Sequence, residues 1–250
     1  MRFVVDKKLW KQNYPSIPRF LCPRCNEGRL IQKKGYEIKT WEPNWITDEL
    51  DMAGLRGDVG QGQFAGFLRC DIQTCDETVV ACGSYTLEIE TVYPEYGNDY
   101  DVIAHYQYKF ARLSPMPPII NLPDNLSDEC SEQIRAAFEL YFVDTGACAN
   151  RLRVAVERLL DQLNIRKRGL KLYQRIDELD KVNPGHRHIL DALRFVGNVA
   201  SHEGDVSFGD VTDCFELLEA ALEELVGNRS TNLQAMANDI INRKGKPAQR

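Results

Sequence analysis

Four cysteines, arranged as two close pairs, are the residues best suited to chemistry. Cys22-Pro-Arg-Cys25 has two residues between its thiols, and Cys70-Asp-Ile-Gln-Thr-Cys75 has four. Zinc prefers four thiolate or imidazole ligands in a tetrahedron, which two tight turns with two thiolates each can supply. The spacing therefore predicts one structural zinc ion held by all four cysteines, with no open position for catalysis. The alternative is four unrelated thiols, and the double-pair arrangement favours the metal.

A second candidate group lies on one predicted helix. In the segment Arg194-Phe-Val-Gly-Asn198-Val-Ala-Ser-His202 the arginine, asparagine and histidine recur at helical spacing and form one polar stripe. Such a stripe can bind phosphate through Arg194, with His202 as an acid or base near neutral pH. Arg151 and Arg153 on an earlier helix would extend it into a binding groove. A structural polar network is the alternative, and both interpretations remain open.

Aromatic side chains between the two cysteine pairs form a third candidate group. Trp41 and Trp45, with Tyr36 nearby, could stack nucleic-acid bases. The favoured interpretation is that they cover the thin core of a small domain. The glycines of residues 54–66 indicate a flexible run, and they lack the Lys-Ser/Thr ending of a phosphate-binding loop.

The elements that must position these groups change character near residue 115. Earlier residues favour β-structure, with strands predicted at 29–32, 36–41, 78–81, 85–93 and 102–113. We therefore predict a small β-rich, zinc-ribbon-like domain over residues 1–114, in which residues 26–69 include an insertion. The proline-dense segment 115–126 is predicted to be a linker.

Residues 127–227 have the apolar spacing of five amphipathic helices in a compact bundle, so the fold class is α+β. Ser127 is predicted to cap the first helix, and Ser207 with Asp210 the fifth. Two helices have a predicted inner face: Ile134, Phe138, Tyr141 and Phe142 in the first, and Ile189, Leu193, Val196, Val199 and Ala200 in the fourth. Residues 228–250 are predicted to be a basic tail that frays at its end.

Composition and charge indicate the compartment and the partners to expect. No apolar run is long enough for a membrane span, and the start of the chain lacks a secretory signal pattern, so we expect a cytoplasmic protein with reduced thiols. The net charge is −6, but residues 1–39 hold ten Lys or Arg against three acids, and residues 40–112 hold four against thirteen. The basic segment can contact nucleic acid or pair with its acidic neighbour, and the second interpretation is slightly favoured.

The C-terminal part resembles the prokaryotic domain of unknown function 4145. The likeness is carried by Asn121-Leu-Pro before the first helix, by Ala149-Asn-Arg-Leu-Arg-Val-Ala-Val-Glu157, and by Gly197-Asn198 followed by His202. The cysteine pairs, with the strand Val79-Val-Ala-Cys-Gly83, are similar to the ribbon that often precedes that domain.

This resemblance implies a helical domain of the HEPN superfamily, whose members commonly dimerise. Many are metal-independent ribonucleases of defence systems, with an arginine four to six residues before a histidine. Here Asn198 and His202 match that motif, whereas Gly197 stands where the arginine is expected and Arg194 lies too far back.

Three functions follow as hypotheses. The first is a non-catalytic module of a prokaryotic defence or regulatory system that binds RNA, DNA or a partner protein encoded nearby. The second is a ribonuclease in which His202 is the acid or base, Arg194 stabilises charge and Asn198 orients the phosphate. The third is a structural protein whose helices form a homodimer. Gly197 in place of arginine favours the first.

Overall fold

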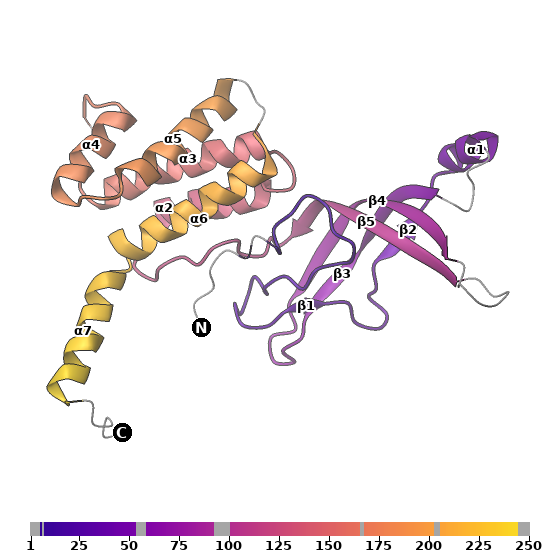
Figure 1. Cartoon of the computed structure of the whole chain (residues 1–250), viewed down its shortest axis with the longest axis horizontal. Helices are drawn as coiled ribbons and strands as arrows, with labels where there is room; N and C mark the ends of the chain where they lie inside the picture. Colours follow the sequence, from indigo (N-terminus) through magenta and orange to yellow (C-terminus); the bar gives the residue numbers. More distant parts are fainter. Residues whose placement is uncertain are drawn as a thin grey trace. The chain divides into compact units, whose positions relative to one another are not determined.

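The chain forms an antiparallel sheet in its N-terminal half, followed by helices (Figure 1). The structure is a computed structural model that describes residues 6, 8–53, 59–92, 101–165, 168–202 and 206–244, except the side chains of 49–51, 53, 91, 92, 101, 102 and 202. It divides into two units that interleave in sequence. The sheet unit comprises the described residues of Asp6–Ile119 together with Phe138–Cys148. The helical unit comprises Ile120–Ala137 and the described residues from Ala149 onward.

The sheet is entirely antiparallel, with strand order β1-β3-β4-β5 and β2 paired to β3 beside β1. The strands are β1 (Leu30–Ile31), β2 (Lys39–Trp41), β3 (Val59–Cys70), β4 (Thr78–Val92) and β5 (Asp101–Ser114). A register shift between Cys82 and Gly83 accommodates an extra residue of β5. The predicted strands 78–81 and 85–93 are one continuous strand, β4, and β-structure dominates the N-terminal half as expected.

The glycine run predicted to be flexible contributes to β3, the strand that pairs with three others. A Cβ atom at Gly62 would lie 2.1 Å from the Trp41 carbonyl oxygen, so a side chain there would prevent the approach of β2. Gly54 and Gly57 lie outside the described residues. The segment between the cysteine pairs also contains a helix that was not expected, α1 (Asn44–Ala53).

Aromatic rings form the core of the sheet unit. Trp10 packs with its ring centroid 5.1 Å from Phe20 and 5.5 Å from Tyr141, and Phe110 lies 5.6 Å from Phe142. The expectation that Tyr141 and Phe142 face the helical bundle is wrong, because their helix ends at Leu140 and both rings join this cluster.

The described residues after β5 form six helices: α2 (Asp128–Leu140), α3 (Thr145–Gln162), α4 (Leu172–Val182), α5 (Arg187–His202), α6 (Phe208–Leu225) and α7 (Arg229–Asn242). Within the helical unit, α5 packs against α4 and α6. The predicted caps are confirmed, since the Cys130 amide donates to the Ser127 hydroxyl and the Asp210 amide to the Ser207 hydroxyl. Within the predicted basic tail, residues 229–242 form the helix α7.

The buried side of α5 differs from the predicted one. Leu193 and Ala200 are buried as expected, but Gly197 is also buried and Val199 is exposed. A Cβ atom at Gly197 would lie 2.6 Å from Cβ of Arg153 on α3. The glycine therefore turns toward α3 and rotates the buried stripe away from Val199.

The proline-rich segment 115–126 contributes to both units. Met116 and Ile119 are buried in the sheet unit, and Ile120 and Leu126 in the helical unit. Asn121 donates its backbone N–H to Glu219 of α6 at 2.9 Å. Prolines keep this connection out of helices and strands, and the burial of its apolar side chains fixes its position. Across the part of the chain that the structure describes, no helix combines the length and apolarity that a bilayer crossing requires.

Candidate metal centre

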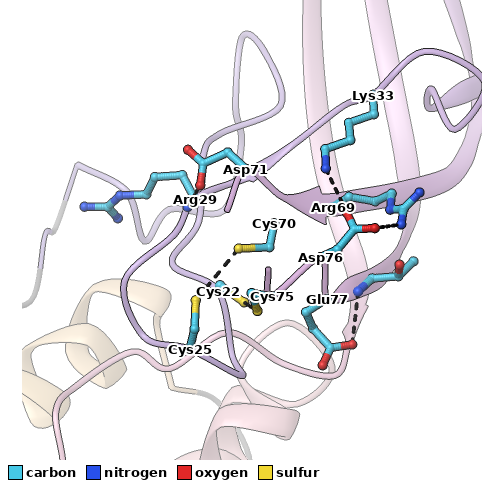
Figure 2. Close-up of polar contacts among 11 residues, drawn as sticks. Cys22, Cys25, Arg29, Lys33, Arg69, Cys70, Asp71, Cys75, Asp76 and Glu77 are labelled. Carbon is cyan, nitrogen blue, oxygen red and sulfur yellow. Dashed lines mark hydrogen bonds and ion pairs between the residues drawn. The ribbon is translucent and has the colours of Figure 1, made fainter. Parts of the chain in front are cut away.

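The four cysteines predicted as ligands lie together at one end of the sheet. Cys70 ends β3, Cys75 lies in the turn toward β4, and Cys22 and Cys25 belong to the turn before β1. Their sulfur atoms all lie within 4.8 Å of one another, and the four could hold a metal ion. Figure 2 shows the thiols of the two turns directed toward a common point.

The sulfur separations fit a tetrahedral metal. The Sγ atoms of Cys22 and Cys75 are 3.7 Å apart, and those of Cys25 and Cys70 are 3.8 Å apart. A tetrahedron with metal–sulfur bonds of about 2.3 Å has edges of about 3.8 Å, so these contacts match the spacing of sulfurs around one zinc-sized ion. Two cysteines come from each turn, which leaves the centre closed on all sides by protein ligands.

The two turns close in the same way. Directly after the last cysteine of each pair stands a residue in the left-handed region, Asn26 with φ 53° and Asp76 with φ 46°. Asn and Asp tolerate this conformation better than other non-glycine residues. Their amides donate back, Asn26 to the Cys22 carbonyl at 3.1 Å and Asp76 to the Ile72 carbonyl at 2.9 Å. Asn26 and Asp76 were not among the residues expected at the site, although an Asn or Asp directly after a cysteine pair favours such a turn.

Hydrogen bonds and ion pairs tie the turns to the sheet around the sulfur cluster (Figure 2). The Arg29 amide donates to the Asp71 carboxylate at 2.8 Å, which links the first turn to the second. The Asp76 carboxylate pairs with Lys33 at 2.8 Å and with Arg69. The Arg29–Asp71 and Lys33–Asp76 contacts join segments about forty residues apart, so they help to hold the two cysteine turns together.

The backbone of Gly28 passes close to the sulfur cluster. A Cβ atom there would lie 2.4 Å from the Cys70 sulfur, so only glycine leaves room for that thiolate. The Gly28 amide also donates to the Cys25 sulfur at 3.3 Å. The residue therefore both admits one ligand and stabilises the charge on another.

The thiols of Cys22, Cys25 and Cys70 differ in acidity. Burial would raise the pKa of Cys25, but hydrogen bonds from the Gly28 and Glu27 amides and from neighbouring thiols lower it to about 7. Burial raises the pKa of Cys70 to about 12 and also raises that of Cys22. A cation at the centre would favour the thiolate form of each, because metal ligation requires deprotonated sulfur.

Within the predicted polar stripe of α5, Arg194 makes intramolecular contacts. Arg194 donates from Nε to Asp191 at 2.8 Å, and its guanidinium lies 4.0 Å from the centre of the Phe195 ring. Asn198 is half-buried on the same helix. His202 is the last residue of α5, and its side chain lies outside the described part of the structure.

Two further arginines predicted to bind a ligand or partner lie on α3. Arg153 pairs with Glu157 at 2.7 Å and packs against Gly197, and Arg151 donates to Gln133 at 3.0 Å. Three of the candidate binding groups, Arg151, Arg153 and Arg194, thus already have protein partners.

The three aromatics between the cysteine pairs do not cover a core. Tyr36 is 44%, Trp41 53% and Trp45 60% exposed. The interpretation that the sequence favoured for them is therefore wrong, because the core of the sheet unit is made by other rings, among them Phe20, Phe64 and Phe110, which are almost fully buried.

Two regions of the chain match models of known protein families. Residues 135–244 match the family model described as domain of unknown function DUF4145, and residues 11–111 match domain of unknown function DUF8608. No curated protein and no solved structure matches the chain. The cysteine centre lies within residues 11–111, and the α5 stripe lies within residues 135–244. The chain is therefore similar to one domain family in its sheet part and to another in its helical part.

Proposed function

We propose that this protein is a non-catalytic nucleic-acid-binding protein whose sheet unit is organised by a structural zinc ion. The proposal includes three structural points: the metal is zinc, the two cysteine turns form a zinc-ribbon-like arrangement, and the helical part is HEPN-like. A role in a prokaryotic defence or regulatory system follows from the family resemblance of the helical part.

A structural rather than catalytic role for the metal is supported by the donor set. Four thiolates complete a tetrahedron and leave no position for water or substrate, which catalytic zinc sites keep open. Free energies of about 10–16 kcal/mol accompany zinc binding in small zinc-dependent domains, so such an ion can decide whether the unit folds.

The proposal of nucleic-acid binding is supported by exposed basic side chains on the sheet unit. Among residues 8–39, six basic side chains are exposed: Lys8, Lys11, Arg19, Arg24, Lys34 and Lys39. Lys33, by contrast, pairs with Asp76, which supports the intramolecular interpretation for that residue alone. Solvent-exposed cations gathered on one small unit attract phosphate even when the whole chain is acidic.

The ribonuclease alternative gains no support from the geometry. Arg194, which would have to stabilise the charge on a reacting phosphate, is neutralised by Asp191 and stacked on Phe195. We therefore expect the purified protein to leave RNA intact in excess EDTA, with the His202→Ala variant behaving identically. Cleavage that disappears in both His202→Ala and Arg194→Ala would instead establish the metal-independent ribonuclease.

Binding is tested by fluorescence anisotropy of labelled RNA and DNA oligonucleotides, single- and double-stranded, between 50 and 300 mM salt. We expect affinity to fall steeply with salt, and the triple variant Lys11→Gln/Arg24→Gln/Lys34→Gln to bind more weakly with a shallower slope, by about 0.7–0.9 per lost phosphate contact. Lys171→Gln/Lys181→Gln in the helical unit is the matched control. Absence of binding at the lowest salt would refute the proposed function.

A further inference from the structure

The structure points to a specific binding surface, which deepens the proposed function and rests on it. We propose that the outer sheet face binds single-stranded nucleic acid. This face is defined here by Tyr36, Lys39, Trp41, Phe67, Lys109 and Arg112. The aromatic rings would stack with bases, and the three cations would contact phosphates.

Strand register places these residues on one side of the sheet. Directly opposed residues of antiparallel strands point to the same face. One row runs from Trp41 through Gln63 and Ser84 to Lys109. Buried residues such as Phe64, Ala81 and Phe110 alternate with these positions and face the core, so the row is on the opposite, outer side.

The next rows extend the same face toward the cysteine centre. Lys39 pairs through Ala65 and Cys82 with Arg112. Beyond it, Phe67 opposes Val80, and the Tyr36 ring lies 6.4 Å from the Phe67 ring at nearly right angles. The Tyr36 backbone accepts a hydrogen bond from the Phe67 amide, which fixes the tyrosine at the strand edge.

Large apolar rings gather here in contact with solvent. Tyr36 and Phe67 are each 44% exposed, Trp41 is 53% exposed, and the neighbouring Val80 is 46% exposed. Exposed rings that cluster on one face are a typical feature of binding surfaces, because an isolated fold gains nothing by leaving them in water. Arg69 lies 4.8 Å from the Tyr36 ring centre and holds that ring in place.

Basic side chains lie on the same face as the exposed aromatic rings. Lys39 and Lys109 are exposed, and the Arg112 side chain is 60% exposed, with its guanidinium 4.0 Å from the Glu139 carboxylate. Farther along β4 the same face becomes acidic, with Glu88 and with Glu90 beside His105. This polarity confines a polyanion to the half of the face nearest the cysteines.

Single strands fit this surface better than duplexes. Trp41 and Phe67 lie two cross-strand rows apart, a separation of roughly 14 Å at about 3.4 Å per residue. That distance allows separate bases of an extended strand to reach each ring, and sheet-borne aromatics are a common platform for unpaired bases. In a duplex the faces of the bases are already stacked on one another and are closed to these rings.

The test uses the full-length zinc-loaded protein and labelled twelve-residue RNA and DNA strands, with the corresponding duplexes in parallel. Trp41→Ala and Tyr36→Ala/Phe67→Ala are each expected to weaken single-strand binding at least about tenfold. Lys109→Gln/Arg112→Gln should reduce the salt slope by about 1.4. Tyr173→Ala, at a tyrosine of α4 that is 45% exposed, is the matched control and should bind as wild type.

The possible outcomes separate the two proposals. If wild type binds nucleic acid but the aromatic variants bind equally well, or if duplexes bind more tightly than single strands, the inference about this face is overturned while the proposed function stands. If wild type binds neither form, both fall, and a protein partner becomes the occupant to seek. Circular dichroism of each variant verifies that the exposed substitutions leave the fold intact.

Discussion

Individual residues decide whether the cysteine centre can close around an ion. The spacing of Cys22, Cys25, Cys70 and Cys75 supplies the ligands, but their sulfurs meet only because Asn26 and Asp76 turn the chain back through the left-handed region. Gly28 contributes by having no side chain at all. Such neighbours set affinity as strongly as the ligands, since they fix where each sulfur points.

The first prediction concerns Gly28. In Gly28→Ala the new methyl group would collide with the Cys70 sulfur at 2.4 Å, so we expect zinc affinity to fall by about 10–100-fold in competition with a colorimetric chelator. Gly209→Ala is the control, because its Cβ atom would meet nothing closer than Ser207 at 3.6 Å. Equal zinc affinity in the two variants would show that the turn relaxes without effect on the site.

The second prediction follows from the thiol pKa values. Burial raises the pKa of Cys70 to about 12 and also raises the pKa of Cys22, so these thiols hold their protons at pH 8, whereas Cys25, with a pKa of about 7, is mostly thiolate. Zinc binding must expel those protons, so affinity rises with pH and is lost as pH falls. Calorimetry at pH 8 in buffers of different ionisation enthalpy should show more than one proton released per zinc. Binding heat that is independent of the buffer would contradict this.

Among the elements, β3 shows how packing overrides local propensity. A glycine-rich segment favours flexibility in isolation, yet here it pairs with β1, β2 and β4 because its small residues admit close neighbours. The helices show the reverse case, since α2 and α6 begin directly after Ser127 and Ser207, the residues predicted to cap them.

The third prediction concerns a buried arginine that joins α4 to α3. The Arg175 side chain is 4% exposed and donates to Asp161 at 2.8 Å and to the Ile165 carbonyl at 3.2 Å. Its removal takes one of two arginine partners from Asp161 and a donor from the Ile165 carbonyl, so Arg175→Ala should destabilise the helical unit by about 2–4 kcal/mol in urea unfolding followed at 222 nm. Asp161 also pairs with Arg158, which is 37% exposed, and Arg158→Ala should cost at most about 1 kcal/mol. Similar losses in both variants would show that burial does not govern this pair.

At the level of the complete chain, the metal should control one unit and not the other. All three tryptophans, Trp10, Trp41 and Trp45, lie in the sheet unit, and Trp10 is buried among its aromatic core. The helices α4 to α7 and most of α3 lie in the helical unit, which contains none of the four cysteines. Tryptophan fluorescence and the helical signal therefore report on different units.

The fourth prediction uses this separation. Complete removal of zinc by a chelator, or the Cys25→Ser substitution, should shift tryptophan emission to the red while most ellipticity at 222 nm remains, because only the sheet unit depends on the ion. Added zinc should reverse the effect of the chelator. Cys82→Ser, which alters a half-buried cysteine outside the cluster, is the control. Unchanged emission after verified metal loss would show that the unit folds without metal.

The features foreseen correctly depend on residues that are near one another in the chain. Cysteine pairs, the Ser207–Asp210 cap and the helical periods all rest on separations of a few positions, where backbone geometry alone dictates which atoms meet. The grouping of the four cysteines needed one further step, that a shared ligand chemistry brings two such turns together.

The remaining features depend on contacts between distant segments. Burial is a property of what packs on a residue, so Trp41 could be assigned to solvent and Tyr141 to the aromatic core only once the folded strands and loops were in place. The outer sheet face is likewise a product of register, which aligns Lys39 with Arg112 across 73 positions of sequence. A local pattern holds too little information to specify such neighbours, because many registers satisfy the same alternation of apolar and polar residues.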